Sequence, residues 1–203
     1  MITVEGRRCP AASSRTSRMI AHGRPGWASR SLAMLVALVS VLGAACTAGG
    51  AGTTGSHATA WRTASLHDVL AGSDFSLADL RGRLVAVETM AIWCINCRLQ
   101  QQQAQAAIAA VDSPDLVYIS LDVDPNEREA DLVAYARKAG FDWRFAVASP
   151  DVARSLAATF GDEILSPPST PLLIIGPDGA LVSKHLGIQG ADALASLLRA
   201  NLP

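Results

Sequence analysis

The chain has 203 residues, half of them hydrophobic, and a formal net charge of -1 at pH 7. This length suits one domain of ordinary size with a sizeable core, and the apolar content excludes a disordered chain. The net charge averages two unlike parts, because residues 1–46 carry six Arg and one acid, whereas residues 47–203 carry eleven basic and seventeen acidic residues. Since the second part is acidic, we expect no nucleic acid partner, which would need clustered Lys and Arg. Four cysteines are too few to staple a small disulfide-rich domain.

The N-terminal residues have the pattern of an export signal. A polar, Arg-containing stretch over residues 1–30 precedes an uncharged apolar run over residues 32–45. The run is shorter than the roughly 20 residues that a membrane-spanning helix needs. A basic stretch, a short apolar run and a small-residue exit together predict a signal peptide over residues 1–45.

The apolar run ends in a cysteine that follows small residues, in the sequence Leu42-Gly43-Ala44-Ala45-Cys46. This sequence resembles the lipobox of bacterial lipoproteins, in which the cysteine is lipidated and becomes the new N-terminus. The resemblance implies a lipid anchor at Cys46 that holds the protein at the extracytoplasmic face of the cell membrane. An ordinary cleaved signal with an incidental cysteine is the alternative. The Ala, Gly, Thr and Ser residues that follow predict a flexible tether over residues 46–60.

Beyond the tether, over residues 61–203, the pattern is that of one α/β domain. Short apolar runs, typical of buried strands, lie at residues 84–87, 116–121, 172–175 and 180–185. Only a tight turn separates the last two runs, so we expect them to form an antiparallel hairpin. Helical stretches separate the earlier runs, which we therefore expect to be parallel. The prediction is a central mixed sheet flanked by helices.

Start and stop signals predict where the helices lie. An acid, Pro, Asn and Glu at residues 124–127 have the form of a capping box with Pro at the first helical position. The expected helices cover residues 96–111, 124–139, 149–160 and 191–200. The four glutamines at residues 100–103 are expected on a solvated face of the first of these helices.

The reactive chemistry of the chain is concentrated in the sequence Trp93-Cys94-Ile95-Asn96-Cys97. A predicted strand ends before the cysteines and a predicted helix begins at them. We therefore expect Cys94 at a helix N-terminus, where free N–H groups and the helix dipole favour the thiolate and lower the pKa of the thiol. The first sulfur is expected to be exposed at the tip of the turn. Cys97 is then one helical turn farther on, close enough to attack a mixed disulfide.

With this motif the chain resembles the thioredoxin superfamily over most of residues 70–200. Glu88 before the cysteines, Thr170-Pro171 ahead of a predicted strand, and the final hairpin and helix also carry the resemblance. Residues 75–83 resemble the lead-in of the extracytoplasmic, membrane-anchored branch, which includes the reductases of cytochrome c maturation. The resemblance implies a thioredoxin-like α/β fold and a protein thiol-disulfide oxidoreductase, monomeric and without a bound cofactor. Its partners would be protein thiols and disulfides.

The resemblance and the chemistry together assign three catalytic residues. Cys94 is the attacking thiolate and Cys97 is the resolving thiol. Glu88 interrupts a buried strand, so desolvation should raise its pKa and make it the proton acceptor for Cys97. A strand-end Glu that faces solvent is the alternative. Gln100 stands where relatives from cytochrome maturation usually carry an acid, which leaves the subgroup and the direction of electron flow open.

Three further residues are expected to bind the substrate. The resemblance implies a cis peptide bond before Pro171, which together with Thr170 would leave an open backbone edge where a substrate pairs as an added strand. A trans Pro in a plain loop is the alternative. Trp93 is expected to pack beside the cysteines and to shield the thiols from water.

Copper delivery is the main alternative function. Residues 121–125 and 176–179 are similar to assembly factors that load copper into cytochrome oxidase, and Cu(I) favours thiolate ligands. Those proteins space their cysteines one residue wider and carry a His where this chain has Pro167-Pro168, while His185 lies on the last predicted strand. Structural zinc lacks two further ligands, and a peroxidase lacks its Pro before the cysteine. A binding module with a static disulfide is the remaining alternative.

Overall fold

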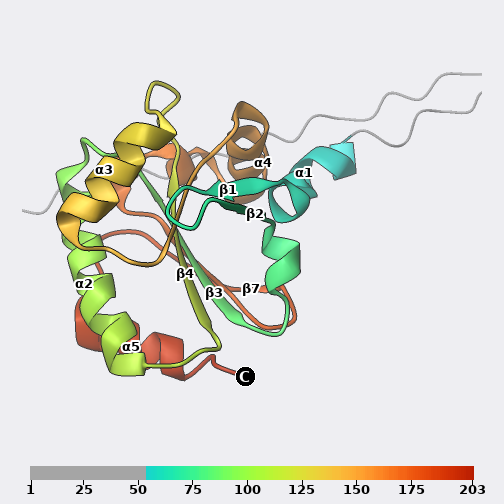
Figure 1. Ribbon diagram of the computed structural model, residues 1–203. Helices are drawn as coiled ribbons and strands as arrows, with labels where there is room; N and C mark the ends of the chain where they lie inside the picture. The colour runs from blue at the N-terminus through green and yellow to red at the C-terminus, as the bar shows by residue number, and fades with distance from the viewer. Residues whose placement is uncertain (1–53) are drawn as a thin grey trace, which may run out of the picture. The chain divides into compact units, whose positions relative to one another are not determined.

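The computed structural model describes residues 54–203, which form the coloured ribbon in Figure 1. The signal peptide expected over residues 1–45 and the lipid anchor expected at Cys46 lie outside the described residues. Within residues 54–203, no helix combines the length and the apolar character needed to cross a membrane.

The first described element is helix α1, which spans Thr54–Thr63. The C-terminal half of the tether expected over residues 46–60 is therefore helical. Trp61, near the end of α1, is only 1% exposed, and its ring meets that of Phe160 edge-on at 5.1 Å between centroids. Tertiary packing of this one large side chain supplies the stability that the Ala, Gly and Thr composition lacks. The folded domain thus begins earlier than the sequence indicates.

A five-stranded mixed sheet with the strand order β5-β4-β3-β6-β7 forms the centre of the domain. Its strands are β3 (Leu84–Met90), β4 (Leu116–Asp122), β5 (Arg144–Val147), β6 (Leu172–Ile175) and β7 (Leu181–His185). Strand β4 is parallel to β3 and to β5, whereas β6 is antiparallel to β3 and to β7. The predicted parallel pair and the predicted C-terminal hairpin are both confirmed.

Helices cover both faces of this sheet (Figure 1). The remaining helices are α2 (Ile95–Val111), α3 (Glu129–Ala139), α4 (Pro150–Phe160) and α5 (Ala191–Arg199). Successive side chains of β3 point to opposite faces, so Val85 and Val87 pack with α1 and α4, while Leu84 and Ala86 pack with α2 and α5. Both faces are buried, which explains the unbroken apolar runs of the central strands.

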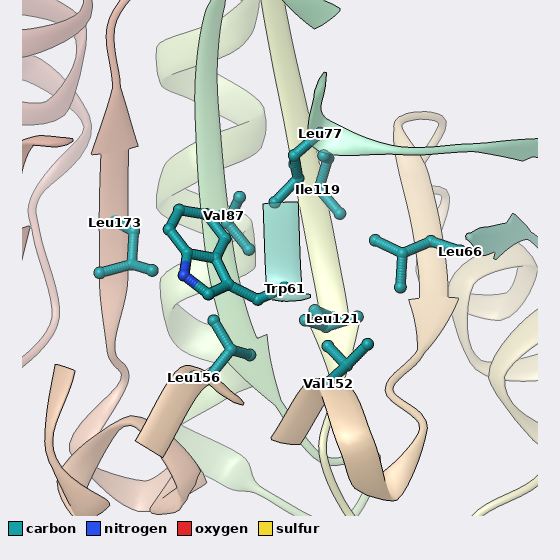
Figure 2. Close-up of a pocket in the computed structure, with 9 residues that line it drawn as sticks. All are labelled: Trp61, Leu66, Leu77, Val87, Ile119, Leu121, Val152, Leu156 and Leu173. Atoms are coloured by element: carbon teal, nitrogen blue, oxygen red, sulfur yellow. The ribbon is translucent and has the colours of Figure 1, made fainter. Parts of the chain in front are cut away.

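The face under α1 and α4 is a closed apolar core. Figure 2 shows nine side chains that meet there, contributed by the sheet, by α1 and α4, and by the segments before β3. They leave an enclosed space of only about 10 Å³. That space is about the size of one water molecule, so these nine side chains form packed core and not a ligand pocket.

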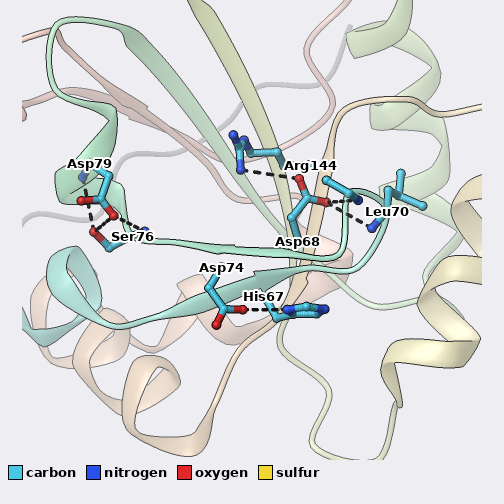
Figure 3. A network of polar contacts seen from close by, with 8 residues as sticks. His67, Asp68, Leu70, Asp74, Ser76, Asp79 and Arg144 are labelled. Atoms are coloured by element: carbon cyan, nitrogen blue, oxygen red, sulfur yellow. Dashed lines mark hydrogen bonds and ion pairs between the residues drawn. The ribbon is translucent and has the colours of Figure 1, made fainter.

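A short hairpin, β1 (Leu66–Asp68) with β2 (Ser73–Phe75), precedes the main sheet. The buried Asp68 carboxylate accepts hydrogen bonds from two backbone amides of the hairpin turn and pairs with Arg144 of β5 at 3.5 Å (Figure 3). The His67–Asp74 pair lies on the exposed side and contributes little to stability. The buried acid therefore joins the lead-in to the edge of the sheet.

Candidate active site at the start of helix α2

Cys94 and Cys97 lie where the chain passes from β3 into α2, and they form a disulfide with 5.3 Å between their Cα atoms. Cys94 is the N-cap of α2, and its Sγ accepts a hydrogen bond of 3.1 Å from the Cys97 amide. In the reduced protein the same amide and the dipole of the helix favour a thiolate on Cys94. The predicted position of Cys94 at a helix N-terminus is confirmed.

The expectation that the Cys94 sulfur is exposed at the tip of the turn is wrong. Cys94 is 3% exposed and Cys97 is fully buried, because both residues pack into a cluster with the end of β3 and with α3. The Cys97 Sγ also lies 3.2 Å from the carbonyl oxygen of Pro167, in the short 3-10 turn η3 (Pro167–Ser169). The nearest exposed side chains belong to the adjoining residues Trp93 and Ile95, which form the rim of the site.

Trp93, which was expected to shield the sulfurs, has a largely exposed side chain. Its side chain is 58% exposed, and its indole Nε1 donates a hydrogen bond of 2.7 Å to the Asp124 carboxylate, on the loop after β4. This hydrogen bond is the main reason why the pKa of Asp124 lies below its usual value. The Asp124 hydrogen bond thus anchors Trp93 to the loop after β4, and the indole remains part of the outer surface.

Glu88 is fully buried in the middle of β3, which excludes the alternative of a solvent-facing carboxylate. Burial raises its pKa to about 8, as the sequence predicted, against a smaller opposing effect of the hydrogen bond from Tyr118. The Tyr118 hydroxyl donates to Oε2 at 2.9 Å, while Oε1 has no hydrogen-bond partner. The carboxyl therefore has one oxygen free to take part in proton transfer.

The peptide bond before Pro171 is trans, because residues 54–203 contain no cis peptide bond. The expected cis bond is therefore wrong. Thr170 instead takes the left-handed conformation, with φ 42° and ψ 59°, and turns the chain from η3 into β6. Thr170 is buried with its hydroxyl unpartnered, and the Pro171 carbonyl accepts a hydrogen bond from Thr89 of β3. The segment lies beside the cysteines, since Cys97 approaches η3 directly.

Polar side chains line the inner face of β4, where the sequence indicated only an apolar strand. Tyr118, Ser120 and Asp122 alternate with the apolar residues of β4 that pack under α1 and α4, so they point toward α2 and α3. Ser120 accepts hydrogen bonds from Gln101 of α2 and from Trp143, at 3.2 and 2.9 Å. The period-two pattern Tyr-x-Ser-x-Asp was the available signal for this polar row.

Two of the four glutamines expected on a solvated face of α2 lie in this interior, whereas Gln102 is exposed as expected. Gln100 and Gln101 are both fully buried, contrary to expectation. The Gln100 side chain accepts a hydrogen bond from the Gln189 amide before α5, and Gln103 accepts one from the Ala191 amide at the start of α5. Long amide side chains therefore bind α2 to β4 and to α5, next to the cysteines.

The expected capping box at residues 124–127 is also wrong. Helix α3 begins at Glu129, because Asp124 and Glu127 are engaged elsewhere. Asp124 caps a local turn by accepting from the Asn126 amide, in addition to binding Trp93. Glu127 accepts the backbone amide of Ile92, two residues before Cys94. Sequence reasoning therefore missed an acidic residue that contacts the active-site turn.

Comparisons with known proteins identify the architecture. No protein-family model and no curated protein matches the chain. Among solved structures, a thioredoxin-family thiol:disulfide interchange protein from Chlorobium tepidum is 20% identical, with a TM-score of 0.57 over 69% of this chain and 93% of that one. The chain has a thioredoxin-like fold.

Two more structures illustrate the range of proteins with this fold. The exposed lipoprotein thioredoxin of Streptococcus pneumoniae is 23% identical, with a TM-score of 0.52 over 68% of this chain and 98% of that one. BsSco, of the Sco family of cytochrome c oxidase assembly proteins, is 17% identical. Its TM-score is 0.54 over 68% of this chain and 90% of that one. At these identities the likeness establishes the thioredoxin-like fold and leaves the activity to the site.

The residues of this thioredoxin-like domain do not assemble the copper ligands that the alternative function requires. Within residues 54–203, no three His, Cys, Asp or Glu residues are grouped so that they could hold a metal ion. The position beside Cys97 is taken by the Pro167 carbonyl, and His185 on β7 is paired with Ser183. A Cu(I) site would have only the two thiolates.

Proposed function

We propose that the chain is a thiol-disulfide oxidoreductase that exchanges electrons with protein disulfides through Cys94 and Cys97. The observation that carries this proposal is the disulfide at the N-terminus of α2, where the Cys97 amide donates to the Cys94 sulfur. A thiolate stabilised in this way attacks disulfides readily, and it is also a good leaving group when a mixed disulfide is resolved. Glu88, buried and protonated up to about pH 8, is the matching proton carrier on the same face of the sheet.

The reaction proceeds in two exchanges. The Cys94 thiolate attacks one sulfur of a substrate disulfide, the substrate S–S bond breaks, and its second sulfur leaves as a thiolate that takes up a proton. Cys97 then gives its proton to the ionised form of Glu88 and attacks Cys94, which releases the second substrate thiol and forms the Cys94–Cys97 disulfide. Two electrons and two protons pass to the substrate. The reverse sequence oxidises a dithiol.

The substrate surface in this proposal is the rim around the buried sulfurs. Trp93 and Ile95 offer exposed apolar area there, and Thr170 and Pro171 provide the neighbouring backbone. Apolar side chains of this kind bind the extended, partly unfolded segments in which protein disulfides are accessible.

The direct test is the reduction of insulin disulfides by dithiothreitol. The full chain should accelerate this reaction in proportion to its concentration, and the same chain with its reduced cysteines alkylated should not. Equal rates for the two preparations would refute the function. A parallel titration with Cu(I) addresses the alternative, because tight binding of one copper ion that is lost in His185→Ala is expected only of a copper-delivery protein.

The proposed location is the extracytoplasmic face of the cell membrane, with the protein held by a lipid on Cys46. The lipobox-like sequence supports this location. In a bacterial host, Cys46→Ala should move the protein from the membrane fraction to the soluble fraction, and the mass of the wild-type N-terminal peptide should include the lipid. An unchanged distribution of the variant between the fractions contradicts the lipid anchor.

A further inference from the structure

The turn that carries Cys94 is fixed by a side chain from a different loop. Ile92 lies in the turn between β3 and α2, and its amide donates to both carboxylate oxygens of Glu127, at 3.0 and 2.8 Å. Within the turn itself, the Cys94 amide donates to the Ala91 carbonyl at 3.1 Å. Hydrogen bonds to a charged acceptor are roughly twice as strong as neutral ones. Glu127 therefore restrains the turn from outside.

A second acid lies behind Glu127. Asp122 is the last residue of β4, in register with Met90 at the end of β3, and it is fully buried. Its Oδ1 accepts the Asp124 amide at 2.9 Å, whereas Oδ2 has no hydrogen-bond partner. The carboxyl of Glu127 interacts with that of Asp122, and two neighbouring carboxyls favour a proton on one of them.

The charge state of Asp122 agrees with this geometry. Burial, and after it the interaction with Glu127, raises the pKa of Asp122 to about 8. Asp122 is therefore neutral at pH 7 and able to donate a hydrogen bond. Above about pH 8 it loses that proton.

We propose that Glu127 is a positioning residue for Cys94: its carboxylate holds the Ile92 amide in the turn between β3 and α2. The inference rests on the proposed redox function of the cysteines. Disulfide exchange needs the attacking, central and leaving sulfurs in one line, so a small displacement of the turn reduces the rate strongly. A positioning residue acts on the rate of this step and on the balance between dithiol and disulfide, without itself touching the substrate.

The other charged groups near Glu127 are committed to partners of their own. Glu127 lines an open groove of about 690 Å³ between the loop after β4 and the start of α4, together with Arg128, Glu129 and Arg154. Both arginines are paired within their own segments; the pairs are Arg128 with Asp131 and Arg154 with Asp151. Asp124, on the same loop, binds Trp93. The hydrogen bonds from the Ile92 amide, and not an ion pair with either arginine, therefore hold the Glu127 carboxylate in place.

The experiment compares Glu127→Ala with Glu127→Gln in the full chain, with Cys9 and Cys46 replaced by Ala so that only Cys94 and Cys97 react with glutathione. The rate of reaction with glutathione disulfide and the dithiol–disulfide equilibrium in glutathione buffer are measured for each. Glu127→Ala should react about tenfold more slowly, because a charge-assisted hydrogen bond is lost. Glu127→Gln should stay within about threefold of the wild type, since its amide oxygen still accepts the Ile92 amide. The control is Glu129→Gln, which makes the same charge change on an exposed residue of α3 and should leave both quantities unchanged.

Thermal melting of both redox forms monitors folding. Two results would overturn the inference: Glu127→Ala reacting like the Glu129→Gln control, or Glu127→Gln reacting as slowly as Glu127→Ala. Glutathione reports on the cysteine pair alone. A failure of insulin reduction with these contrasts intact would therefore refute the proposed function and leave the positioning role standing.

Discussion

Cys94→Ser is expected to abolish disulfide exchange, whereas Cys97→Ser is expected to trap the substrate. Without the Cys94 thiolate no mixed disulfide forms, and the buried Cys97 is not placed to attack in its stead. Without Cys97 the first exchange still occurs, and the mixed disulfide through Cys94 then accumulates because nothing resolves it. The loss of turnover should be complete in both variants, the largest effect of any substitution considered for this chain.

The measurement has to exclude the other two cysteines of the chain, Cys9 and Cys46. Both variants are therefore made in a Cys9→Ala/Cys46→Ala background, mixed with insulin, quenched with acid and separated without reductant. A band whose mass equals that of the chain plus one insulin molecule is expected for Cys97→Ser alone. If Cys94→Ser gives that band and Cys97→Ser does not, the roles of attacking and resolving cysteine are exchanged; if both variants retain full turnover, the mechanism is wrong.

The main sheet was largely predictable because its signals are local. Strands β3, β4 and β6 are buried on both faces, so each appears in the sequence as an unbroken apolar run. The tight turn at residues 176–179 leaves room only for a hairpin. Strand β5, at residues 144–147, and the three-residue strands β1 and β2 are too short to stand out from the surrounding sequence.

The parts of the site that sequence reasoning missed depend on partners distant in the chain. Residues 124–127 have a correct local pattern for a helix start, but hydrogen bonds to the turn at Ile92 and Trp93 take precedence over the cap. Gln100 and Gln101 look like a polar helix surface until α5 and β4 supply acceptors and donors for their amides. A local pattern records what a side chain is able to bind, and only the fold determines which partner it meets.

The second large effect concerns Glu88, for which stability and catalysis should change in opposite directions. Its pKa is raised from an ordinary value of 4.5 to about 8 by burial. Between these two pH values the unfolded chain has lost the proton and the folded chain retains it, so the free energy of unfolding falls as pH rises. By pH 7 this one group should have removed about 3 kcal/mol relative to pH 4.

Glu88→Gln should abolish that loss. A neutral amide still accepts the Tyr118 hydroxyl and does not ionise, so the variant should gain about 3 kcal/mol over the wild type at pH 7 and little at pH 4. Urea unfolding at both pH values measures the difference. Glu129→Gln, which makes the same change at an exposed residue, should leave the free energy of unfolding unchanged at both pH values. A wild-type stability that is flat from pH 4 to pH 7 would contradict the raised pKa.

The same substitution should slow catalysis. Glu88→Gln has no carboxylate to accept the Cys97 proton, so resolution of the mixed disulfide should be about 100-fold slower at pH 7, while its formation by Cys94 is unchanged. Quenched-flow sampling of the mixed disulfide separates the two steps. A variant that is more stable and slower indicates a carboxyl kept in the core for its chemistry. A variant that is more stable and equally fast would reduce Glu88 to a destabilising residue without a catalytic role, and Cys97 would then need another proton acceptor.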